Sequence, residues 1–430
     1  MKVLVLYSLD RFSLRDTVKS HLNSFKEHKS LNCLYVNIKS QIPAFLQGLD
    51  FDLIILHYTL LAGGRFHIDS RKWLHKVKAI KNLNGFKVAI PQDEYLQSER
   101  LLNLFKESEV QLICTTLIEK QDISNVYLKH EDYQPKVIKV LTGYLSKKLV
   151  EENEDAPELK NRPIDVSYRA RRIPFYCGEH GDLKFKLLTF FTNYFKSTDF
   201  LIDIKNTDDR TKRKNAVLDG KAWFKFLKSS KSVIGCEGGS SLWDSEGGIQ
   251  LKIKEFIKRK TDPDFENVKA NCFPDEDFNI HNFALGPRNL EAVATKTLQI
   301  LVEGYFNGIL IPWKHYLPLK KDFSNAHEII SYLNDTPFCQ KIVDTAYEDI
   351  TNNKDLSYQS FVDRILKECI DSSEFSLRAK SKISYLLRLR VSLTNFLLLC
   401  GGQFKQLTKK FLSNFINVYK LKEILKLNNI

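Results

Sequence analysis

The sequence predicts an α/β protein built from two doubly wound domains, followed by a helical C-terminal extension. Short apolar runs alternate with amphipathic stretches through residues 1–145, and the same alternation resumes at residue 164. Alternation at this spacing indicates parallel strands joined by crossover helices. A chain of 430 residues with 43% hydrophobic composition is also too long for one ordinary core and fits two.

The first domain is expected over residues 1–150. Its apolar runs are continuous, which is typical of strands covered by helices on both faces of a sheet. The predicted strands are Val3–Tyr7, Leu34–Ile38, Leu53–His57, Val88–Pro91, Gln111–Thr115 and Val137–Leu141. Amphipathic segments that predict helices lie between them, at Leu14–Lys26, Ser70–Ile80 and Glu99–Glu107.

The second domain is expected over residues 151–330, after an acidic linker at 149–163 that contains two prolines. The chain is expected to be helical from Ser324 onward, and residues 331–430 should pack back on the two domains. Ligands bind outside the carboxyl ends of parallel strands, so two facing domains suit a two-substrate transferase. The second domain's predicted strands are Ile164–Tyr168, Phe200–Ile204, Ser232–Cys236 and Thr297–Val302, and its helices are Asp182–Phe195, Ala222–Ser229 and one that includes Leu290–Ala294.

Three arginines follow the first strand of the second domain. Arg169, Arg171 and Arg172 come just after the predicted strand end at Tyr168, and glycines 178 and 181 are expected to precede a helix. Cations on a strand-end loop ahead of a helix N-terminus suit a diphosphate. The alternative is a solvated basic loop.

A glycine-rich turn follows the predicted strand Ser232–Cys236. Gly238 and Gly239 would let the backbone approach a ligand closely. Ser240 could bond that ligand or cap the next helix, and Glu237 could contact a sugar. A tight turn with an N-cap explains the same residues without a ligand.

A third segment places a carboxylate and a cation on one helix. Gly286 and Pro287 open this helix, and Arg288 and Glu291 lie one turn apart in it. A carboxylate there can accept hydrogen bonds from both hydroxyls of a ribose, with Arg288 near the phosphates.

These segments resemble a known family. Residues 287–292 (PRNLEA), followed by a strand and Glu303-Gly304, resemble the donor-site signature of group-1 GT-B glycosyltransferases. Residues 168–171 (YRAR), 91–95 (PQDEY) and 141–144 (LTGY) are similar to bacterial members of surface-polysaccharide pathways. The resemblance covers residues 50–350.

The resemblance implies a GT-B fold and transfer of a sugar from a nucleotide-sugar to a glycan or lipid-linked acceptor. Glu291 would hold the donor ribose, Arg169 with Arg171 or Arg288 would neutralise the diphosphate, and residues 238–241 would line the pocket. Many retaining members carry another Glu eight residues before the ribose-binding Glu. In this chain that position is Phe283. The stereochemical outcome is therefore left open. A GT-B-like sugar-nucleotide-binding scaffold without catalysis is the alternative function.

An inverting transferase also needs a base for the acceptor hydroxyl. Asp93 is the first candidate, His57 the second and Glu94 a weaker one, because all three stand at the ends of first-domain strands that should face the cleft. The alternatives without a catalytic role are that Asp93 caps a helix N-terminus and that His57 is a buried histidine at a strand end.

The C-terminal segment 375–430 carries eleven Lys or Arg against one acid, Glu423, and so holds +10 of the net charge of +13. Its basic and apolar residues alternate at helical spacing, which predicts either docking on an anionic membrane or a helix packed on the body. The nearly neutral remainder argues against a nucleic-acid binder.

Other classes of site are not indicated. The eight cysteines form no CxxC pair, no metal site or organic cofactor is predicted, and neither DxD-like stretch resembles a metal motif. The first apolar run is too short for a signal peptide, and no window is apolar enough to span a bilayer. We expect a cytoplasmic protein that is soluble or peripheral on the inner face of the membrane.

Overall fold

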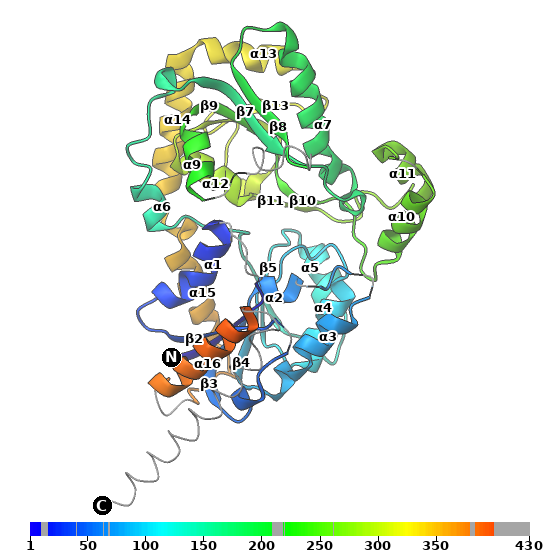
Figure 1. The fold of residues 1–430 in the computed structure, drawn as a ribbon, viewed down its shortest axis with the longest axis vertical. Coiled ribbons are helices and arrows are strands. Elements are labelled where there is room, and N and C mark those ends of the chain that lie inside the picture. Colours follow the sequence, from blue (N-terminus) through cyan, green and yellow to red (C-terminus); the bar gives the residue numbers. More distant parts are fainter. Residues whose placement is uncertain are drawn as a thin grey trace, which may run out of the picture.

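The computed structural model describes residues 1–9, 16–39, 41–62, 64–67, 69–208, 218, 220–260, 262–378 and 383–399. It contains a six-stranded and a five-stranded parallel sheet, which lie in separate lobes (Figure 1). We call the unit around the six-stranded sheet the first lobe and the unit around the five-stranded sheet the second lobe. This α/β architecture with two parallel sheets and C-terminal helices is GT-B-like, and it confirms the predicted fold class.

The first lobe contains each of the six predicted strands. The sheet has the order β2-β1-β3-β4-β5-β6, and every neighbouring pair is parallel. Its strands are β1 (Lys2–Tyr7), β2 (Asn32–Asn37), β3 (Asp50–Leu56), β4 (Asn84–Ala89), β5 (Leu112–Thr115) and β6 (Lys136–Lys139). Its helices are α1 (Asp16–Glu27), α2 (Tyr58–Ala62), α3 (Arg71–Val77), α4 (Ser98–Glu107) and α5 (Lys120–Tyr127).

Both faces of this sheet are buried, as the continuous apolar runs predict. Val3 and Val5 of β1 belong to one core, which also contains Phe361 from the C-terminal region. Leu4 and Leu6 belong to the opposite core, against α3, α4 and α5. Because side chains alternate along a strand, a run without polar interruption can fill both cores at once.

The second lobe has the sheet order β13-β12-β9-β7-β8, again with parallel neighbours. Its strands are β7 (Ile164–Ala170), β8 (Ile202–Asn206), β9 (Ser230–Gly235), β12 (Leu298–Val302) and β13 (Leu317–Leu319). Its helices are α7 (Gly178–Tyr194), α9 (Lys221–Lys228), α12 (Pro287–Ala294), α13 (Ala326–Ser331) and α14 (Thr336–Thr351).

Two details of this lobe differ from the sequence prediction. The edge strand β13 was not expected, because three residues are too few for a recognisable pattern. The glycines 178 and 181 lie inside the first turns of α7 instead of preceding the helix. Gly178 has a positive φ of 67° and contacts Ser241 and Asp277 so closely that a side chain would collide with both.

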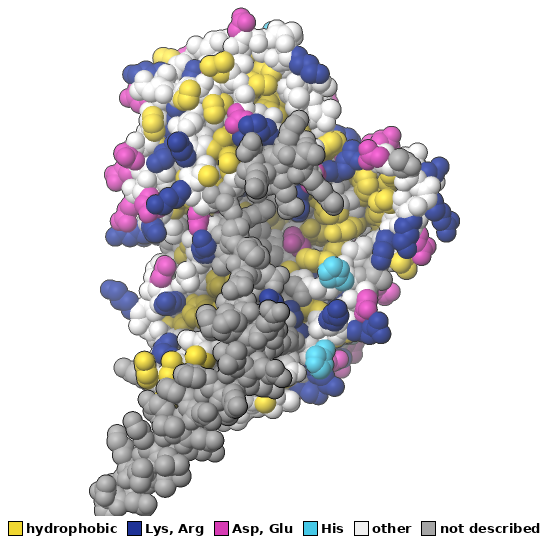
Figure 2. Space-filling model, in the orientation of Figure 1, with side chains coloured by type: hydrophobic (Ala, Val, Ile, Leu, Met, Phe, Trp, Pro, Cys, Tyr) yellow, Lys and Arg dark blue, Asp and Glu magenta, His cyan; other side chains and the backbone are white. Residues whose placement is uncertain are grey.

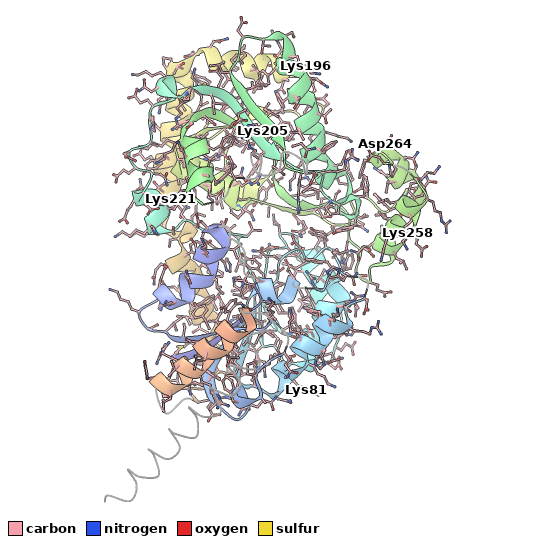
Figure 3. All side chains as sticks on the ribbon, viewed as in Figure 1. Lys81, Lys196, Lys205, Lys221, Lys258 and Asp264 are labelled. Carbon is pink, nitrogen blue, oxygen red and sulfur yellow. The ribbon has the colours of Figure 1, made fainter. Side chains whose placement is uncertain are left out.

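An insert between β9 and α12 projects from the second lobe (Figure 1). It consists of β10 (Gly238–Ser240) paired antiparallel with β11 (Asn282–Ala284), and of α10 (Gly248–Lys258) and α11 (Phe265–Cys272). Part of the predicted glycine-rich turn is therefore a short strand. Lys258 and Asp264 mark this unit in Figure 3, where Lys196, Lys205 and Lys221 mark the second lobe and Lys81 the first.

The base of the insert joins the two lobes through main-chain hydrogen bonds. The N–H of Gln97 donates to the Asp244 carbonyl at 2.8 Å, and the N–H of Asp244 donates to the Tyr95 carbonyl at 2.8 Å. A third bond runs from the Glu99 N–H to the Ser245 carbonyl at 3.1 Å. The loop after β4 is thus attached to the second lobe by backbone atoms.

The chain then returns to the first lobe. Helix α15 (Tyr358–Ile370) packs on the core shared by α1 and β5, whereas α14 packs on the second lobe. Helix α16 (Tyr385–Leu399) lies along β2, where Asn395 accepts the N–H of Asn37 at 3.0 Å and Val391 is buried. Residues 400–430 of the predicted basic tail lie outside the described part of the chain.

The visible surface carries both signs of charge over both lobes and over the projecting insert (Figure 2). Among the described residues, no helix is both long and apolar enough to cross a membrane.

The predicted linker is closely tied to the body. Its first residues belong to α6 (Lys147–Glu151), and it includes Arg162, which is 3% exposed. The Arg162 guanidinium donates to the carbonyls of Pro157, Leu227, Ser230 and Thr295 and to the Thr297 hydroxyl, at 2.9–3.2 Å. Burial lowers the pKa of Arg162 to about 10, so the side chain stays charged at neutral pH.

We expect Arg162→Met to lower the free energy of unfolding by about 3 kcal/mol, because several buried acceptors lose their donor at once. Urea unfolding followed by circular dichroism measures this. The matched control is Lys160→Met, at an exposed residue paired with Glu158 at 2.7 Å, which should change stability by less than about 0.5 kcal/mol. Equal effects of the two substitutions would contradict this account of Arg162.

Candidate active site

One cavity of about 370 Å³ lies where the two lobes meet. Its walls come from the carboxyl ends of β7 and β9, the N-terminal turns of α9 and α12, and Lys184 of α7. Asp16 and Thr17, at the start of α1, reach it from the first lobe. The position agrees with the general rule for ligands of parallel sheets.

Four cationic side chains line this cavity, and they differ in whether another protein group binds them. Arg169 is 4% exposed and bound to Asp203, with Nη2 to Oδ2 at 2.6 Å, and its guanidinium lies 4.2 Å from the Phe226 ring centre. Arg288 donates from Nη1 to the Arg169 carbonyl at 2.9 Å. Arg171 and Lys184 have no hydrogen-bond or ion-pair partner for their side chains within the described residues. They are therefore the cations with capacity for an anionic ligand.

The carboxylate of Glu291 lines the same cavity and is 6% exposed. Trp223 Nε1 donates to its Oε2 at 2.7 Å. The Thr17 hydroxyl of the first lobe donates to its Oε1 at 3.3 Å. The sequence-predicted ribose carboxylate and the predicted arginines thus surround one space.

The glycine-rich segment divides between the cavity and the core. Gly238 lines the cavity, but Gly239 and Ser240 do not. Gly239 has a φ of 105° and lies against the Asn282 carbonyl in the β10–β11 pair, which leaves no room for a side chain. Ser240 is fully buried and donates to the Cys177 carbonyl at 3.1 Å. These two residues shape the turn and are not placed to touch a ligand.

Glu237 connects the cavity to the loop after β12. It is 5% exposed, and its Oε1 accepts the Phe306 N–H at 2.7 Å. A side chain at Gly304 would collide with the Glu237 carboxylate. Burial raises the pKa of Glu237, and these backbone donors oppose the rise. Gly304 of the predicted Glu303-Gly304 pair therefore allows close packing against Glu237.

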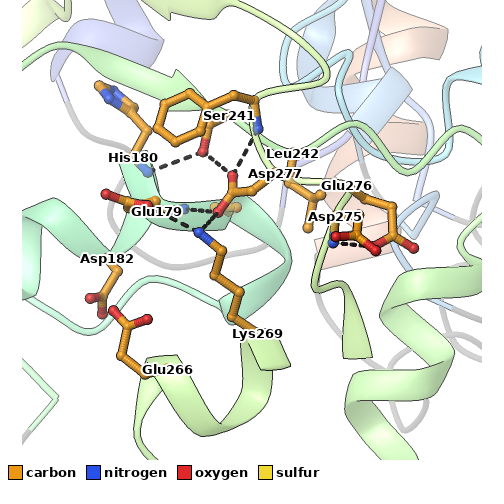
Figure 4. A network of polar contacts seen from close by, with 12 residues as sticks. Glu179, His180, Asp182, Ser241, Leu242, Glu266, Lys269, Asp275, Glu276 and Asp277 are labelled. Atoms are coloured by element: carbon orange, nitrogen blue, oxygen red, sulfur yellow. Dashed lines mark hydrogen bonds and ion pairs between the residues drawn. The ribbon is translucent and has the colours of Figure 1, made fainter. Parts of the chain in front are cut away.

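A polar network holds the start of α7 to the insert (Figure 4). Asp277 Oδ2 accepts the Glu179 N–H at 3.0 Å, and Oδ1 accepts the Ser241 hydroxyl at 2.7 Å. The same hydroxyl accepts the His180 N–H at 3.1 Å, and Lys269 lies 3.6 Å from Asp277 Oδ2. Protein groups thus cap this helix end, and the N–H groups of Glu179 and His180 are already bound by side chains.

His57 and Glu94 are both fully buried in the first lobe, away from the cavity. His57 Nε2 lies 3.0 Å from His21 Nδ1, and burial lowers the pKa of both rings, that of His21 to about 3. Glu94 accepts hydrogen bonds from the hydroxyls of Thr115, Thr116 and Tyr127. Protein groups therefore satisfy the hydrogen-bonding atoms of both side chains, and both residues have the surroundings of structural groups.

Asp93 differs from these two because its side chain is exposed. Its backbone is left-handed, with a φ of 54°, and is held by the buried Arg65. The Arg65 guanidinium donates to the carbonyls of Gln92 and Asp93 at 3.0 and 3.1 Å, and to that of Leu96 at 3.0 Å. Asp93 therefore occupies a rigid loop at the carboxyl end of β4.

The surroundings of Asp93 also affect its ionisation. Although Asp93 is exposed, groups of both lobes lie around its carboxyl. Desolvation by these groups raises its pKa, whereas the nearby charges of Arg65 and Lys184 and a hydrogen bond with Tyr95 oppose the rise. Lys184 also lines the cavity, so the first-lobe carboxyl and the cavity share a neighbouring cation. A carboxylate with a raised pKa is a better proton acceptor than an ordinary one.

The cavity also contains residues that the sequence did not single out, among them Lys184, Trp223 and Thr17. Lys184 and Trp223 lie within predicted helices, where a lysine or tryptophan has no distinctive neighbours, and Thr17 belongs to the other lobe. Only the spacing of Lys184 from Arg171 across a strand-to-helix connection could have suggested a shared site. Within the described ranges, no group of three or more His, Cys, Asp or Glu could hold a metal ion.

No family model and no curated protein matches this sequence. The chain is similar in structure to an α-glucosyltransferase in complex with UDP-glucose and DNA containing an abasic site, with 11% identity and a TM-score of 0.48, over 86% of this chain and 100% of the other. It is also similar to sucrose-phosphate synthase from Thermosynechococcus elongatus, with 11% identity and a TM-score of 0.44 over 86% and 100%.

A glycosyltransferase from Rickettsia africae ESF-5 is similar at 12% identity and a TM-score of 0.43, over 86% of this chain and 99% of the other. Identities and scores at this level say nothing about a shared ligand or reaction. The function proposed below therefore depends on the residues of the cavity.

Proposed function

We propose that this protein is a glycosyltransferase that binds a nucleotide-sugar in the cavity of the second lobe and transfers the sugar to an acceptor in the interlobe cleft. The observation that supports this most directly is the composition of the cavity. It combines the Glu291 carboxylate with two cations that have no partner among the described residues, Arg171 and Lys184. A carboxylate suits ribose hydroxyls, and the cations suit a diphosphate.

The size and position of the cavity fit this ligand. About 370 Å³ lies within the usual range for small-molecule sites. Glu291 and Arg288 lie one turn apart on α12, the spacing expected for contacts to a ribose and its phosphates. Thr17 completes the wall from the first lobe, so an acceptor on that lobe would meet the donor at the same opening.

In the proposed reaction, the bond between the anomeric carbon and the diphosphate oxygen breaks, and a bond from the acceptor oxygen to that carbon forms. Arg171 and Lys184 stabilise the negative charge that develops on the departing nucleoside diphosphate. We assign Asp93 as the group that takes the acceptor proton, because it is exposed at the carboxyl end of β4 and its carboxyl lies near Lys184, which lines the cavity.

We further propose that the acceptor is a glycan or a lipid-linked saccharide of a surface polysaccharide, and that the enzyme works in the cytoplasm at the membrane. The concentration of positive charge in 375–430 supports this. Removing residues 400–430 should abolish sedimentation with anionic liposomes. Because the described part of this segment packs on β2, a truncated protein that still sediments equally would contradict the membrane proposal.

A thermal-shift panel tests the donor proposal. UDP, GDP, ADP and CDP are compared with inorganic pyrophosphate, and we expect at least one nucleoside diphosphate to raise the melting temperature more than pyrophosphate does. Release of that nucleoside diphosphate from its sugar conjugate then tests transfer or hydrolysis. Binding without any release would instead favour the scaffold function.

Glu291→Ala should weaken binding of the selected nucleoside diphosphate by more than tenfold, because the ribose loses its acceptor. Isothermal titration calorimetry measures the dissociation constant. Glu328→Ala is the control, since Glu328 is exposed on α13 and does not line the cavity. Unchanged affinity in Glu291→Ala would remove the ribose assignment.

A further inference from the structure

We propose that Gln299 recognises the nucleobase of the donor and selects a base with a carbonyl at its edge, as in uracil and guanine, over a base with an amino group there, as in cytosine and adenine. This inference depends on the proposed function and deepens it by naming the class of base. It starts from a buried side-chain amide that lines the cavity and whose N–H group has no acceptor among the described residues.

Gln299 is a polar residue in an otherwise apolar strand. Strand β12 has the sequence LQILV, and its side chains alternate between the two faces of the sheet. Leu298 and Ile300 join the hydrophobic core on one face. Gln299 lies on the opposite face, where it lines the cavity and is 2% exposed. A buried amide costs free energy unless its polar atoms find partners, so the contacts of this side chain indicate what a ligand must supply.

Neighbouring groups fix which end of this amide meets the cavity. The Gly286 N–H can only donate, and it donates to Asn289 Oδ1 at 3.0 Å. Asn289 Nδ2 is therefore left as a donor, and it donates to Gln299 Oε1 at 3.0 Å. The Gln299 oxygen is thus bound within the protein, whereas its Nε2 group has no partner in the described part of the chain. A carbonyl of a ligand would give this group the acceptor that it lacks.

Gln299 and the cations lie at different ends of the cavity. Gln299 is in register with Val233 of β9, and Val233 is in register with Ser167 of β7. Strand β12 is two strands away from β7, roughly 10 Å across the sheet. Arg171 comes four residues after Ser167, roughly 13 Å further along the strand direction. A diphosphate bound at Arg171 therefore leaves Gln299 for the opposite end of the ligand, which is the base.

The surroundings of Gln299 suit a planar ring. Val233 is its neighbour across the sheet, and the Leu227 carbonyl accepts the hydroxyl of Thr297, two residues before Gln299, at 3.0 Å. Members of the same small hydrophobic cluster line the cavity, namely Leu218, Trp223, Phe224, Leu227 and Val233. A nucleobase has apolar faces and a polar edge, so apolar walls beside an amide donor complement it.

The base preference of the full chain tests the inference. Uracil carries the carbonyl O4 where cytosine carries an amino group, and guanine carries O6 where adenine carries an amino group. Dissociation constants of UDP, CDP, GDP, ADP and inorganic pyrophosphate are measured by calorimetry. In the pair that the cavity accommodates, we expect the carbonyl base to bind about tenfold more tightly than its amino counterpart, because an amino group facing Gln299 Nε2 leaves both donors without an acceptor.

Two substitutions change the amide in different ways. Gln299→Met keeps the length of the side chain but removes the donor, so the preference should fall below about twofold. Asn289→Asp keeps an oxygen for the Gly286 N–H but presents a second oxygen to Gln299. The Gln299 amide should then turn round and point its own oxygen at the ligand, so that the preference reverses in favour of the amino base. The added charge acts on both bases alike, and the ratio of the two dissociation constants therefore reports the orientation of the amide.

Gln359→Met is the matched control. Gln359 is exposed on α15, where it donates to Asp363 at 3.1 Å, and it does not line the cavity. This variant should keep the wild-type preference, and melting temperatures without ligand verify that each variant is folded. A Gln299→Met protein that binds both bases more weakly but keeps their ratio overturns the inference, since the effect would then be a general disturbance of the cavity.

The other failures are also distinguishable. A wild type that binds carbonyl and amino bases equally, or prefers the amino base, overturns the inference and leaves the proposed function standing. An Asn289→Asp protein that keeps the wild-type preference overturns it as well. A wild type that binds pyrophosphate but none of the four nucleoside diphosphates overturns the proposed function and the inference together.

Discussion

Asp93→Asn should lower the rate of sugar transfer by about 10²- to 10⁴-fold and leave nucleoside diphosphate binding unchanged. Asparagine cannot accept the acceptor proton, but it has nearly the same shape as aspartate. It also tolerates the left-handed backbone that Asp93 adopts at a φ of 54°, so the loop held by Arg65 should not change. The loss should appear in kcat, measured by nucleoside diphosphate release with saturating donor.

The pH dependence of kcat is a second test of the role of Asp93. Enclosure raises the pKa of Asp93, so its ionised, proton-accepting form is lost as pH falls through a value above the ordinary 3.8. The acid limb of the kcat profile should therefore lie at a higher pH than an ordinary aspartate would give, and it should disappear in Asp93→Asn. The groups that face this carboxyl are Arg65, Lys184, Tyr95, Tyr176 and Cys177. Of these, Arg65, Lys184 and Tyr95 act against the rise in its pKa.

Asp132→Asn is the control for this substitution. Asp132 is an exposed first-lobe carboxylate paired with Lys106, so the same chemical change there should leave kcat and its pH profile as in the wild type. Wild-type turnover in Asp93→Asn would mean that another group, or the donor itself, takes the acceptor proton.

Removing both Arg171 and Lys184 should weaken binding of a nucleoside diphosphate by about 100-fold or more. Each charge-assisted contact contributes about 1.5–3 kcal/mol, and about 1.4 kcal/mol corresponds to a factor of ten. The double variant Arg171→Ala/Lys184→Ala should bind the corresponding nucleoside as the wild type does, because a nucleoside has no phosphate. Calorimetry with both ligands measures the contrast.

Lys186→Ala provides the matched control on the same helix. Lys186 is exposed and pairs with Asp182 and Glu266 at 3.5 and 3.4 Å, so it is already engaged outside the cavity. Its loss should change neither affinity. If the double variant keeps wild-type affinity for the diphosphate, then Arg169 and Arg288 hold the phosphates despite their contacts with the protein.

The pairing state of the cations shows why the candidate site could be predicted only in part. The sequence places Arg169, Arg171 and Arg172 in one short segment, and nothing local distinguishes them. In the structure, Asp203 of the neighbouring strand neutralises Arg169, whereas Arg171 has no partner among the described residues. The difference depends on which side chains the sheet register brings together, and register is a long-range property.

The first-lobe candidates show the same limit. His57 and Asp93 each follow a parallel strand, so the strand pattern predicts them equally well. Burial against His21 removes His57 from consideration, and it results from α1 and α15 packing on that face of the sheet. The return of α15 to the first lobe after α14 covers the second has no signal in the local sequence.

The sequence by itself determined the two parallel sheets, because short apolar runs that alternate with amphipathic segments are typical of strands covered on both faces. It also determined that Arg288 and Glu291 lie one turn apart in one helix. Only the tertiary structure decided which charged groups are satisfied by the protein and which face the cavity. The physical reason is that secondary structure depends on spacing along the chain. The availability of a charge instead depends on its desolvation and on partners that are distant in sequence and meet only when both lobes have folded.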